Sequence, residues 1–264
     1  MPRFSANIST LFREFPMLER IGQAASAGFD AIEVQFPYDE DPEQFKAELE
    51  LHRLPLVLMN FPVGDLMQGG QGLAAVPGRE TEFDAALIEA QKFAEILKPE
   101  AMNLLSGRPD STRDSAHCDA AFRTSLRKAF ALTSKLGIRL LIEPVNTIDL
   151  PGFYLCGSQQ ALDLIATMPD IELLLQYDLY HMQMMEADLM TRLPAIIDSI
   201  GHIQFSDVPG RTEPGRGSID FAACFDLIDR LDYRGYVGAE YFPSVNTGSS
   251  LEWLIPYRQD RRDQ

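Results

Sequence analysis

The sequence predicts a single-domain α/β protein that folds as a (β/α)8 TIM barrel. Eight short apolar runs alternate with eight longer stretches of helical spacing along the whole chain, which is typical of parallel βαβ units. Dividing 264 residues among eight units gives 33 residues per unit, and such barrels take about 250 residues in total. A doubly wound open sheet usually has a glycine-rich turn after its first strand, whereas the segment here reads Ser5-Ala6-Asn7-Ile8-Ser9.

The predicted strands and helices alternate in order. The strand candidates are short apolar runs, which we place at residues 4–8, 31–36, 55–61, 101–105, 138–143, 171–177, 202–205 and 236–240. The helix candidates have apolar residues three and four positions apart and lie at 17–27, 42–52, 81–97, 114–136, 158–166, 186–197, 221–231 and 250–256. Gly28 and Gly137 end two of these helices, where a left-handed C-cap is expected.

The chain contains no linker that would divide it into domains. We expect residues 1–258 to form the barrel and residues 259–264 to be a short mixed-charge tail. The only long glycine-rich loop, residues 64–78, follows the third strand and is predicted to be a lid or a binding loop.

The composition limits the classes of partner. The chain has 23 basic and 39 acidic residues, so its formal net charge is −16. Such a surface repels a phosphate backbone, and no nucleic-acid partner is expected. No apolar run reaches 18 residues and the first ten residues lack the apolar stretch of a signal peptide, so no membrane partner is expected. Three scattered cysteines favour a reducing compartment, and we predict a cytoplasmic protein.

Polar side chains with oxygen atoms follow four consecutive predicted strands. Strand five ends in Glu143, strand six is followed by Asp178, strand seven carries Gln204 with Asp207 just beyond it, and strand eight ends in Glu240. The C-terminal ends of barrel strands form the active site in this architecture. Three carboxylates at one rim repel each other unless a cation lies among them, and oxygen ligands suit Mg²⁺ or Mn²⁺. A single strand-end carboxylate more often caps a helix or pairs with a surface base, but the recurrence on four adjacent strands favours a metal site.

Two further residues are candidates for binding a substrate. His181 lies three residues after Asp178, where it could hold or polarise a substrate oxygen or could be an ordinary hydrogen-bonded loop residue. Arg211 lies in the loop at 207–217 together with Arg216. An arginine there could bind a substrate carboxylate in a bidentate manner, or the loop could simply be solvated.

Several other residues are expected to have structural roles. Glu33, inside the second strand, is either an inward carboxylate near the rim or a buried ion-pair partner. His202 is expected at the bottom of the barrel, away from the chemistry. A group of methionines favours packing against a neighbouring helix or subunit and is compatible with a homodimer: Met182, Met184, Met185 and Met190.

Several segments resemble the hydroxypyruvate isomerase family, which belongs to the xylose-isomerase-like barrels. The segments are RFSANIS, FPYD, IEPVNTIDLPGF, QYDLYHMQMME, EPGRGSIDF and GAEY, and the similarity extends over essentially the whole chain. The resemblance implies a divalent metal held by four residues, namely Glu143, Asp178, Gln204 and Glu240. It also implies that Glu143 and Glu240 are the acid/base pair and that His181 and Arg211 contact the substrate. Related ketose epimerases usually have histidine where this chain has Gln204, which favours the isomerase branch.

The activity implied by the resemblance is an aldose–ketose isomerisation of a small 2-oxo acid. Hydroxypyruvate and tartronate semialdehyde (2-hydroxy-3-oxopropanoate) would interconvert through an enediolate, with two carboxyl groups moving the proton. A 2-oxo-tetronate isomerase, or a related small sugar or oxo-acid isomerase or epimerase, is the alternative in the same class. Two other classes are a metal-dependent apurinic endonuclease and a catalytically silent binding barrel.

Overall fold

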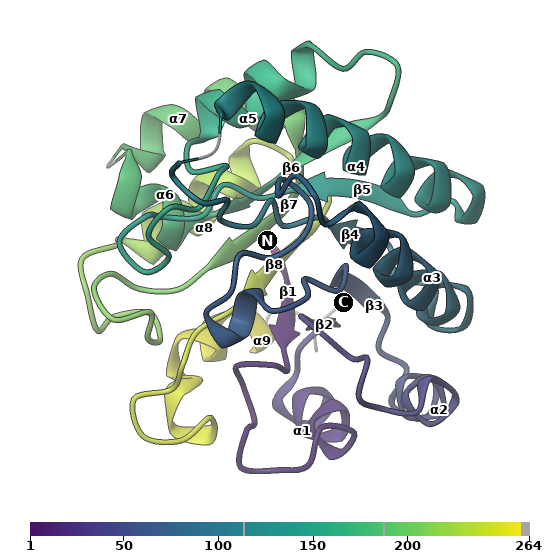
Figure 1. Ribbon diagram of the computed structural model, residues 1–264. Helices are drawn as coiled ribbons and strands as arrows, with labels where there is room; N and C mark the ends of the chain where they lie inside the picture. Colours follow the sequence, from purple (N-terminus) through teal and green to yellow (C-terminus); the bar gives the residue numbers. More distant parts are fainter. Residues whose placement is uncertain (113, 187, 260–264) are drawn as a thin grey trace.

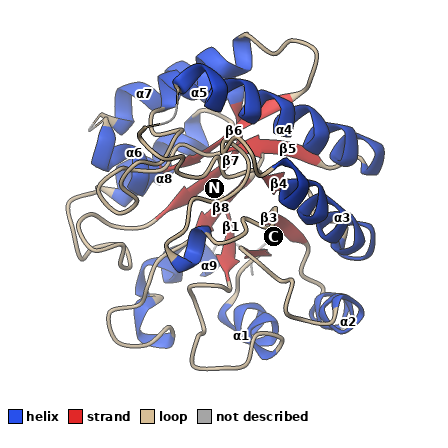
Figure 2. Cartoon of the chain, in the orientation of Figure 1, coloured by secondary structure: helices blue, strands red, loops and turns tan. Residues whose placement is uncertain are grey.

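Eight parallel strands form a closed barrel in which each strand pairs with its neighbour in the sequence and β8 closes on β1. The computed structural model describes residues 1–112, 114–186 and 188–259. The strands lie at the centre and the helices surround them (Figures 1 and 2). The predicted (β/α)8 TIM barrel is therefore confirmed. In the described ranges, no helix is both long and apolar enough to cross a bilayer.

The strands lie within three residues of their predicted bounds. They are β1 (Arg3–Asn7), β2 (Ala31–Val34), β3 (Leu56–Asn60), β4 (Ala101–Asn103), β5 (Arg139–Ile142), β6 (Leu173–Asp178), β7 (Ile200–Phe205) and β8 (Tyr236–Ala239).

The described α-helices include two whose bounds match the prediction, α2 and α5. In order they are α1 (Glu19–Ala27), α2 (Pro42–His52), α3 (Glu80–Leu97), α4 (Ser115–Leu136), α5 (Ser158–Ala166), α6 (Leu179–Met185), α7 (Leu189–Ile196), α8 (Phe221–Arg230) and α9 (Ile255–Gln259). Short 3₁₀ helices are η1 (Leu66–Gln68), η2 (Ile197–Ser199), η3 (Gly248–Ser250) and η4 (Glu252–Leu254).

Local sequence signals fix the ends of several helices. Asp41 accepts hydrogen bonds from two backbone N–H groups of α2, and Asp114 accepts one from the first turn of α4. Such a cap satisfies donors that have no partner inside the helix. Gly28 and Gly137 end α1 and α4 with φ angles of 87° and 71°. Because glycine adopts this left-handed conformation without steric cost, the predicted C-caps are confirmed.

The main hydrophobic core lies between the outer surface of the barrel and the helices. Phe4 of β1, Phe205 of β7 and Phe225 of α8 are buried in it. The ring centroids of Phe4 and Phe225 are 5.0 Å apart, as are those of Phe205 and Trp253. Edge-on aromatic pairs add to the stabilisation that comes from burying apolar surface. This packing fixes the strands on both sides of β8.

Two predicted helices differ from the structure. The segment after β6 was expected to be a loop followed by a helix at 186–197, but it forms α6 and then α7. Asp178 explains α6, because its side chain accepts a hydrogen bond from the backbone N–H of Tyr180 and caps the helix. The helix expected at 250–256 is divided among η3, η4 and α9. Residues 260–264 of the predicted tail lie outside the described residues.

The glycine-rich segment 64–78 contains η1 and is attached to its neighbours by side chains. Arg79 Nη1 lies 2.6 Å from Asp65 Oδ1. Arg108 Nε donates a hydrogen bond to the carbonyl oxygen of Gly70 at 2.6 Å. The segment is therefore held in place on the molecule by an ion pair and by a main-chain contact, and a lid role for it stays a prediction.

Strand register sets the predicted site residues at one end of the barrel. Asp178 lies opposite Gln204, and Gln204 lies opposite Gly238 on the next strand. Glu143 and Glu240 come directly after β5 and β8. The four predicted metal ligands are thus at the C-terminal ends of consecutive parallel strands.

Candidate active site

Two buried carboxylates and a histidine lie together at the C-terminal end of the barrel. One ligand atom from each of Glu143, Asp178 and His181 can be chosen so that all three lie within 4.8 Å of one another. His181 Nε2 is 3.6 Å from Asp178 Oδ2 and 3.9 Å from Glu143 Oε1. A group of this kind, buried and mostly anionic, could hold a metal ion.

Arg211 joins the fourth predicted residue, Glu240, to this group. Its Nη2 atom lies 2.8 Å from Glu240 Oε2 and 3.2 Å from Asp178 Oδ2. The guanidinium also stacks over the ring of Tyr180, with 5.3 Å between its Cζ atom and the ring centroid. The structure therefore brings five of the six predicted site residues into one connected cluster, and Gln204 lies beside it on β7.

Three amide side chains hold the carboxylates, and the sequence analysis did not identify them. Asn7 Nδ2 and Gln35 Nε2 donate to Glu240 Oε1 at 2.9 and 2.6 Å. Asn103 Nδ2 donates to Glu143 Oε2 at 2.8 Å. Asn7 and Asn103 are the last residues of β1 and β4, and Gln35 follows β2. The criterion of a polar residue at a strand end, applied to strands one to four as well, would have found them.

Burial makes these carboxyl groups difficult to ionise. Burial and the negative charges of Glu240 and Asp178 raise the pKa of Glu143 well above its usual value. Burial likewise raises the pKa of Asp178, against the opposing effect of the Arg211 guanidinium. For Glu240, burial is again the largest cause and raises the pKa to about 7. The site therefore holds protons near neutral pH or takes up positive charge in their place.

His181 is neutral, and its tautomer follows from its neighbours. Burial, together with the nearby Arg211 charge, lowers the pKa of His181 well below its usual value. The backbone N–H of Asn146 points at Nδ1 at a distance of 3.4 Å, and Asn146 Nδ2 lies 2.7 Å from the same atom. Because Nδ1 accepts these hydrogen bonds, the ring proton is on Nε2. His181 therefore presents an N–H donor to the carboxylates, not a lone pair to a metal.

His202 does not lie away from the site, as the sequence analysis had expected. Its Nε2 atom is 2.7 Å from Glu33 Oε1 inside the barrel. The other oxygen of Glu33 accepts a hydrogen bond from Gln204 Nε2 at 2.7 Å. The expectation was wrong because the inward-facing His202 lies only one inward position below Gln204 on β7. Glu33 is thus a buried ion-pair partner; although burial opposes it, His202 and the hydrogen bonds keep its pKa low.

The loop between β7 and α8 is built around Asp207. This buried carboxylate accepts backbone N–H hydrogen bonds from five loop residues, namely Val208, Gly215, Arg216, Gly217 and Ile219. The backbone of Arg211, with a φ of 54°, is further fixed because its carbonyl oxygen accepts a hydrogen bond from the N–H of Phe242 at 2.8 Å. The loop therefore places Arg211 over the strand ends, whereas Arg216 pairs with Glu213.

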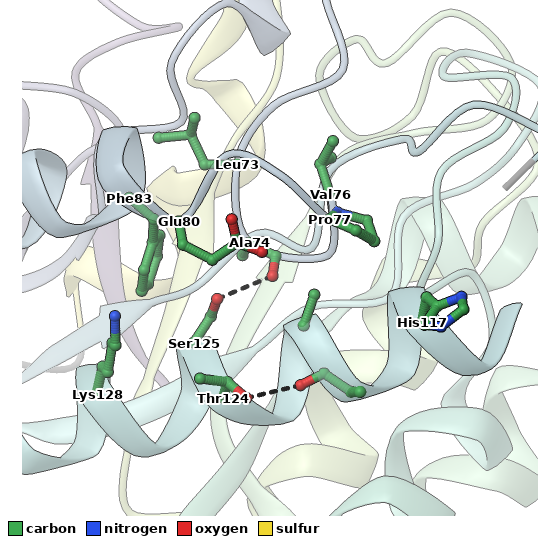
Figure 3. A pocket seen from close by; sticks show the side chains of 12 residues that line it. Leu73, Ala74, Val76, Pro77, Glu80, Phe83, His117, Thr124, Ser125 and Lys128 are labelled. Carbon is green, nitrogen blue, oxygen red and sulfur yellow. Dashed lines mark hydrogen bonds between the residues drawn. The ribbon is translucent and has the colours of Figure 1, made fainter. Parts of the chain in front are cut away.

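A separate cavity of about 290 Å³ lies outside the barrel, between the loop after β3 and helix α4 (Figure 3). Its polar side chains are used in local contacts. Ser125 Oγ donates to the carbonyl oxygen of Ala74 at 2.9 Å, which fastens the loop to α4. Glu80 accepts a hydrogen bond from the N–H of Gly78, and Lys128 pairs with Asp84. These contacts are structural, so the cluster at the strand ends is the candidate active site.

The family model for the xylose isomerase-like TIM barrel matches residues 21–257. The chain belongs to the xylose isomerase-like TIM barrel family. A hydroxypyruvate isomerase from Escherichia coli (strain K12) is 43% identical over 258 residues, covering 98% of this chain and all of that protein. A 2-oxo-tetronate isomerase from Cupriavidus necator is 36% identical and covers 97% of this chain and 99% of that protein. The resemblance to hydroxypyruvate isomerases is confirmed.

Solved structures agree with this family assignment. A crystal structure described as an AP endonuclease of family 2 from Brucella melitensis has a TM-score of 0.93 and 38% identity, covering 98% of this chain and 100% of that chain. A 3-keto-D-glucoside 4-epimerase from E. coli has a TM-score of 0.80 at 20% identity, covering 97% of this chain and 99% of that chain. The second likeness supports the fold alone.

Proposed function

We propose that this chain is an aldose–ketose isomerase that interconverts hydroxypyruvate and tartronate semialdehyde. The observation that carries the proposal is the buried cluster itself, in which Glu143 and Glu240 have raised pKa values and lie on either side of Asp178 in strand order. Buried carboxyl groups with raised pKa values are suited to general acid–base catalysis. The full-length similarity to a hydroxypyruvate isomerase supports the substrate.

The residues of the site fit a small divalent cation. We assign as its ligands the four oxygen-bearing residues at the strand ends, namely Glu143, Asp178, Gln204 and Glu240. Oxygen ligands favour Mg²⁺ or Mn²⁺, and buried like charges that repel each other favour a cation among them. A cation held there would stabilise the negative charge that develops on two adjacent oxygens of the substrate.

The two glutamates move the proton between carbons. One carboxylate removes a proton from C3 of hydroxypyruvate, which gives an enediolate across C2 and C3. The other carboxyl group delivers a proton to C2, and the hydroxyl proton passes from the C3 oxygen to the C2 oxygen. Glu143 and Glu240 meet this requirement because they follow two different strands, β5 and β8. The amides of Asn7, Gln35 and Asn103 hold their carboxylates in position.

His181 and Arg211 are assigned to the substrate's own oxygens. The Nε2–H of His181 faces the cluster and can donate to a carbonyl or hydroxyl oxygen of the substrate. Arg211 Nε is buried and has no hydrogen-bond partner in the described part of the chain. A buried N–H group without an acceptor is suited to a substrate carboxylate, because a guanidinium binds a carboxylate through two of its N–H groups.

The proposal extends to the class of partner and to the cellular compartment. A small 2-oxo acid suits a site that contains the Arg211 guanidinium, and a net charge of −16 disfavours nucleic acid. The three scattered cysteines support a cytoplasmic location. The homodimer stays a prediction: Met182 is buried within the subunit, whereas Met185 and Met190 are exposed.

Nuclease activity is a second candidate because one similar crystal structure is described as an AP endonuclease. His181 is at the site, but His202 is bound to Glu33, and His52 and His117 lie on the outer helices α2 and α4. A site with several zinc ions needs more histidine or carboxylate ligands around each ion than one histidine and three carboxylates supply. These observations favour the isomerase.

The deciding experiment is proton NMR of hydroxypyruvate with the purified protein in D2O. We expect conversion to tartronate semialdehyde that needs Mg²⁺ or Mn²⁺, stops with EDTA and exceeds the enzyme-free rate. Glu143→Gln should reduce the rate by about 10²–10⁴-fold because it removes one proton-transfer group. Glu89→Gln, on the exposed face of α3, is the matched control and should retain the rate.

Other outcomes assign the chain differently. An inactive protein on hydroxypyruvate that converts 2-oxo-tetronate would correct the substrate and keep the reaction class. Cleavage of an abasic DNA duplex, with no turnover of either oxo acid, would contradict the isomerase proposal. Unchanged activity in Glu143→Gln would overturn the assignment of the acid/base pair.

A further inference from the structure

Gln204 differs from the other three proposed metal ligands in one chemical respect. A carboxylate presents oxygen on both sides, whereas an amide presents oxygen on one side and an NH2 group on the other. Only the oxygen can bind a cation. The usefulness of Gln204 as a ligand therefore depends on what fixes the direction of its amide.

Glu33 is the residue that receives the NH2 group of Gln204. Its Oε2 atom lies 2.7 Å from Gln204 Nε2. Its Oε1 atom accepts hydrogen bonds from Ser5 Oγ at 2.5 Å and from His202 Nε2 at 2.7 Å. Glu33 and His202 are almost fully buried, so these contacts are made without competition from solvent. A carboxylate held by three donors accepts hydrogen bonds only and cannot pair with the Gln204 oxygen.

The opposite side of the Gln204 amide agrees with this orientation. Gln204 Oε1 accepts a hydrogen bond from Gln176 Nε2 at 2.6 Å. A carbonyl oxygen has two lone pairs, so this contact leaves one for a cation. Gln204 lies opposite Asp178 in the β6–β7 register, which places it at the level of the carboxylate cluster.

The barrel provides space for the Glu33 carboxylate at one position. Gly238 of β8 lies opposite Gln204 and also opposite Ser5, so it lies between two of the strands that contact Glu33. A Cβ atom built on Gly238 would lie 1.8 Å from Glu33 Oε1. The close approach requires glycine here because any side chain would push the carboxylate away from its partners.

We propose that Glu33 is a positioning residue for the metal site: held by His202 and Ser5 in the space beside Gly238, it orients the Gln204 amide with its oxygen toward the cation. This inference rests on the proposed assignment of Gln204 as a metal ligand. Residues that orient a ligand without touching the metal typically change metal affinity by about 10–100-fold when they are replaced.

The first test is Mn²⁺ affinity of folded Glu33→Gln measured by calorimetry. The new amide keeps the hydrogen bonds of Ser5 and His202 by placing its oxygen toward them, which turns its NH2 group toward Gln204. Gln204 must then turn its own oxygen away from the site. We expect Mn²⁺ to bind about 10–100-fold more weakly than to wild type. Glu89→Gln, the same change of side chain on the exposed face of α3, is the matched control and should bind Mn²⁺ as wild type does.

The second test reverses the sign of the effect. In Gln204→Glu, the new carboxylate lies against Glu33 and repels it. Adding Glu33→Gln to that variant restores a donor–acceptor pair with the roles exchanged, so the same substitution should now strengthen Mn²⁺ binding. A substitution that merely damaged the barrel would weaken binding in both backgrounds.

A third variant leaves both side chains intact. Gly238→Ala displaces the Glu33 carboxylate and should reproduce the loss seen in Glu33→Gln, which keeps the inference testable if that variant does not fold. Wild-type affinity in Glu33→Gln, or an equal loss in both Gln204 backgrounds, overturns the role of Glu33 while the metal site stands. Wild-type protein that does not bind Mn²⁺ overturns the proposed metal site and this inference together.

Discussion

Glu240 shows at the scale of one residue how the barrel interior changes the chemistry of a side chain. Its carboxyl group is buried beside other acidic groups, and burial raises its pKa to about 7. Asn7, Gln35 and Arg211 donate hydrogen bonds to it, and Arg211 and Gln35 limit the rise in pKa. A group of this kind changes its charge near neutral pH.

The raised pKa of Glu240 predicts a pH dependence of stability. Between the ordinary value of 4.5 and about 7, the folded protein keeps a proton that the unfolded chain has lost. The free energy of unfolding must therefore fall as pH rises through this window. Glu240→Gln lacks this contribution, so the stability difference between wild type and variant should change by about 3 kcal/mol from pH 4.5 to pH 7. Urea unfolding in EDTA measures the free energy of unfolding of both proteins at each pH. If this free energy changes with pH in the same way for wild type and variant, the prediction is contradicted.

The sequence predicted some single residues better than others. Glu143, Asp178 and Glu240 could be found because each is a carboxylate at a strand end, and the barrel brings strand ends together. The pairing of Glu33 with His202 could not be found in this way. These residues lie on β2 and β7, and their contact depends on the space left by Gly238 inside the barrel. Strand alternation predicts which side chains face inward, but not how far each one reaches.

At the scale of elements, the loop between β7 and α8 is the part of the site that depends on one side chain. Asp207 accepts hydrogen bonds from five backbone N–H groups of this loop, and the loop carries Arg211. Buried N–H groups that lose their acceptor destabilise a protein more than the hydrogen bond itself stabilised it. The position of Arg211 therefore depends on Asp207, although the two side chains serve different purposes.

We predict that Asp207→Ala loosens the loop and weakens substrate binding together. The free energy of unfolding should fall by about 3 kcal/mol, because several buried N–H groups lose their acceptor. KM for the oxo acid should rise, because Arg211 is no longer held over the site. Asp207→Asn keeps one oxygen and should show a smaller change in both quantities. Chemical unfolding and steady-state kinetics measure the two effects, and an Ala variant with wild-type stability would contradict this account.

Elements with a long periodic pattern were predicted well, and short ones were not. Helices α2 and α5 match their predicted bounds, whereas α6 was expected to be a loop. Seven residues are too few for an amphipathic period to be read, and the signal that starts α6 is the cap from Asp178. The sequence analysis placed that same aspartate directly after a strand and did not extend a helix from it. The helix predicted at 250–256 was wrong for a similar reason, because the segment after β8 consists of short helical turns.

At the scale of the whole molecule, the barrel places several acidic groups at one end of its interior. Folding must therefore offset repulsion among Glu143, Asp178 and Glu240, which Arg211 relieves only in part. A divalent cation bound to the folded state would remove this cost, and binding to the folded state alone stabilises a protein.

We predict that Mn²⁺ stabilises the whole barrel. At 100 times its dissociation constant, the ion should add about 3 kcal/mol to the free energy of unfolding. For a chain of this length, that gain corresponds to a Tm increase of about 6–12 °C. EDTA should reverse the shift, and Asp178→Asn should lose most of it because it removes the charge of a proposed ligand. Differential scanning calorimetry checks this; an equal shift in the variant would indicate binding elsewhere.

The fold as a whole was the most predictable feature. Eight repeats of one pattern give eight independent indications of the same architecture, so an error of one or two residues in any strand does not change it. The site is less predictable because it depends on contacts between strands that lie far apart in the sequence. Asn7, for example, donates to Glu240 across 233 positions of the chain.

The Asp178 side chain has two roles, one for each of its carboxylate oxygens. One of its oxygens begins helix α6, and the other faces His181 and Arg211. Asparagine would preserve the first task, since an amide oxygen caps a helix as well as a carboxylate does. A duplicated gene released from catalysis would therefore still be selected for Asp or Asn here, whereas position 143 would be free to drift. An Asp or Asn at this position in a distant barrel is therefore explained by the helix cap alone, and on the proposed assignment the residue at position 143 is the one that reports activity.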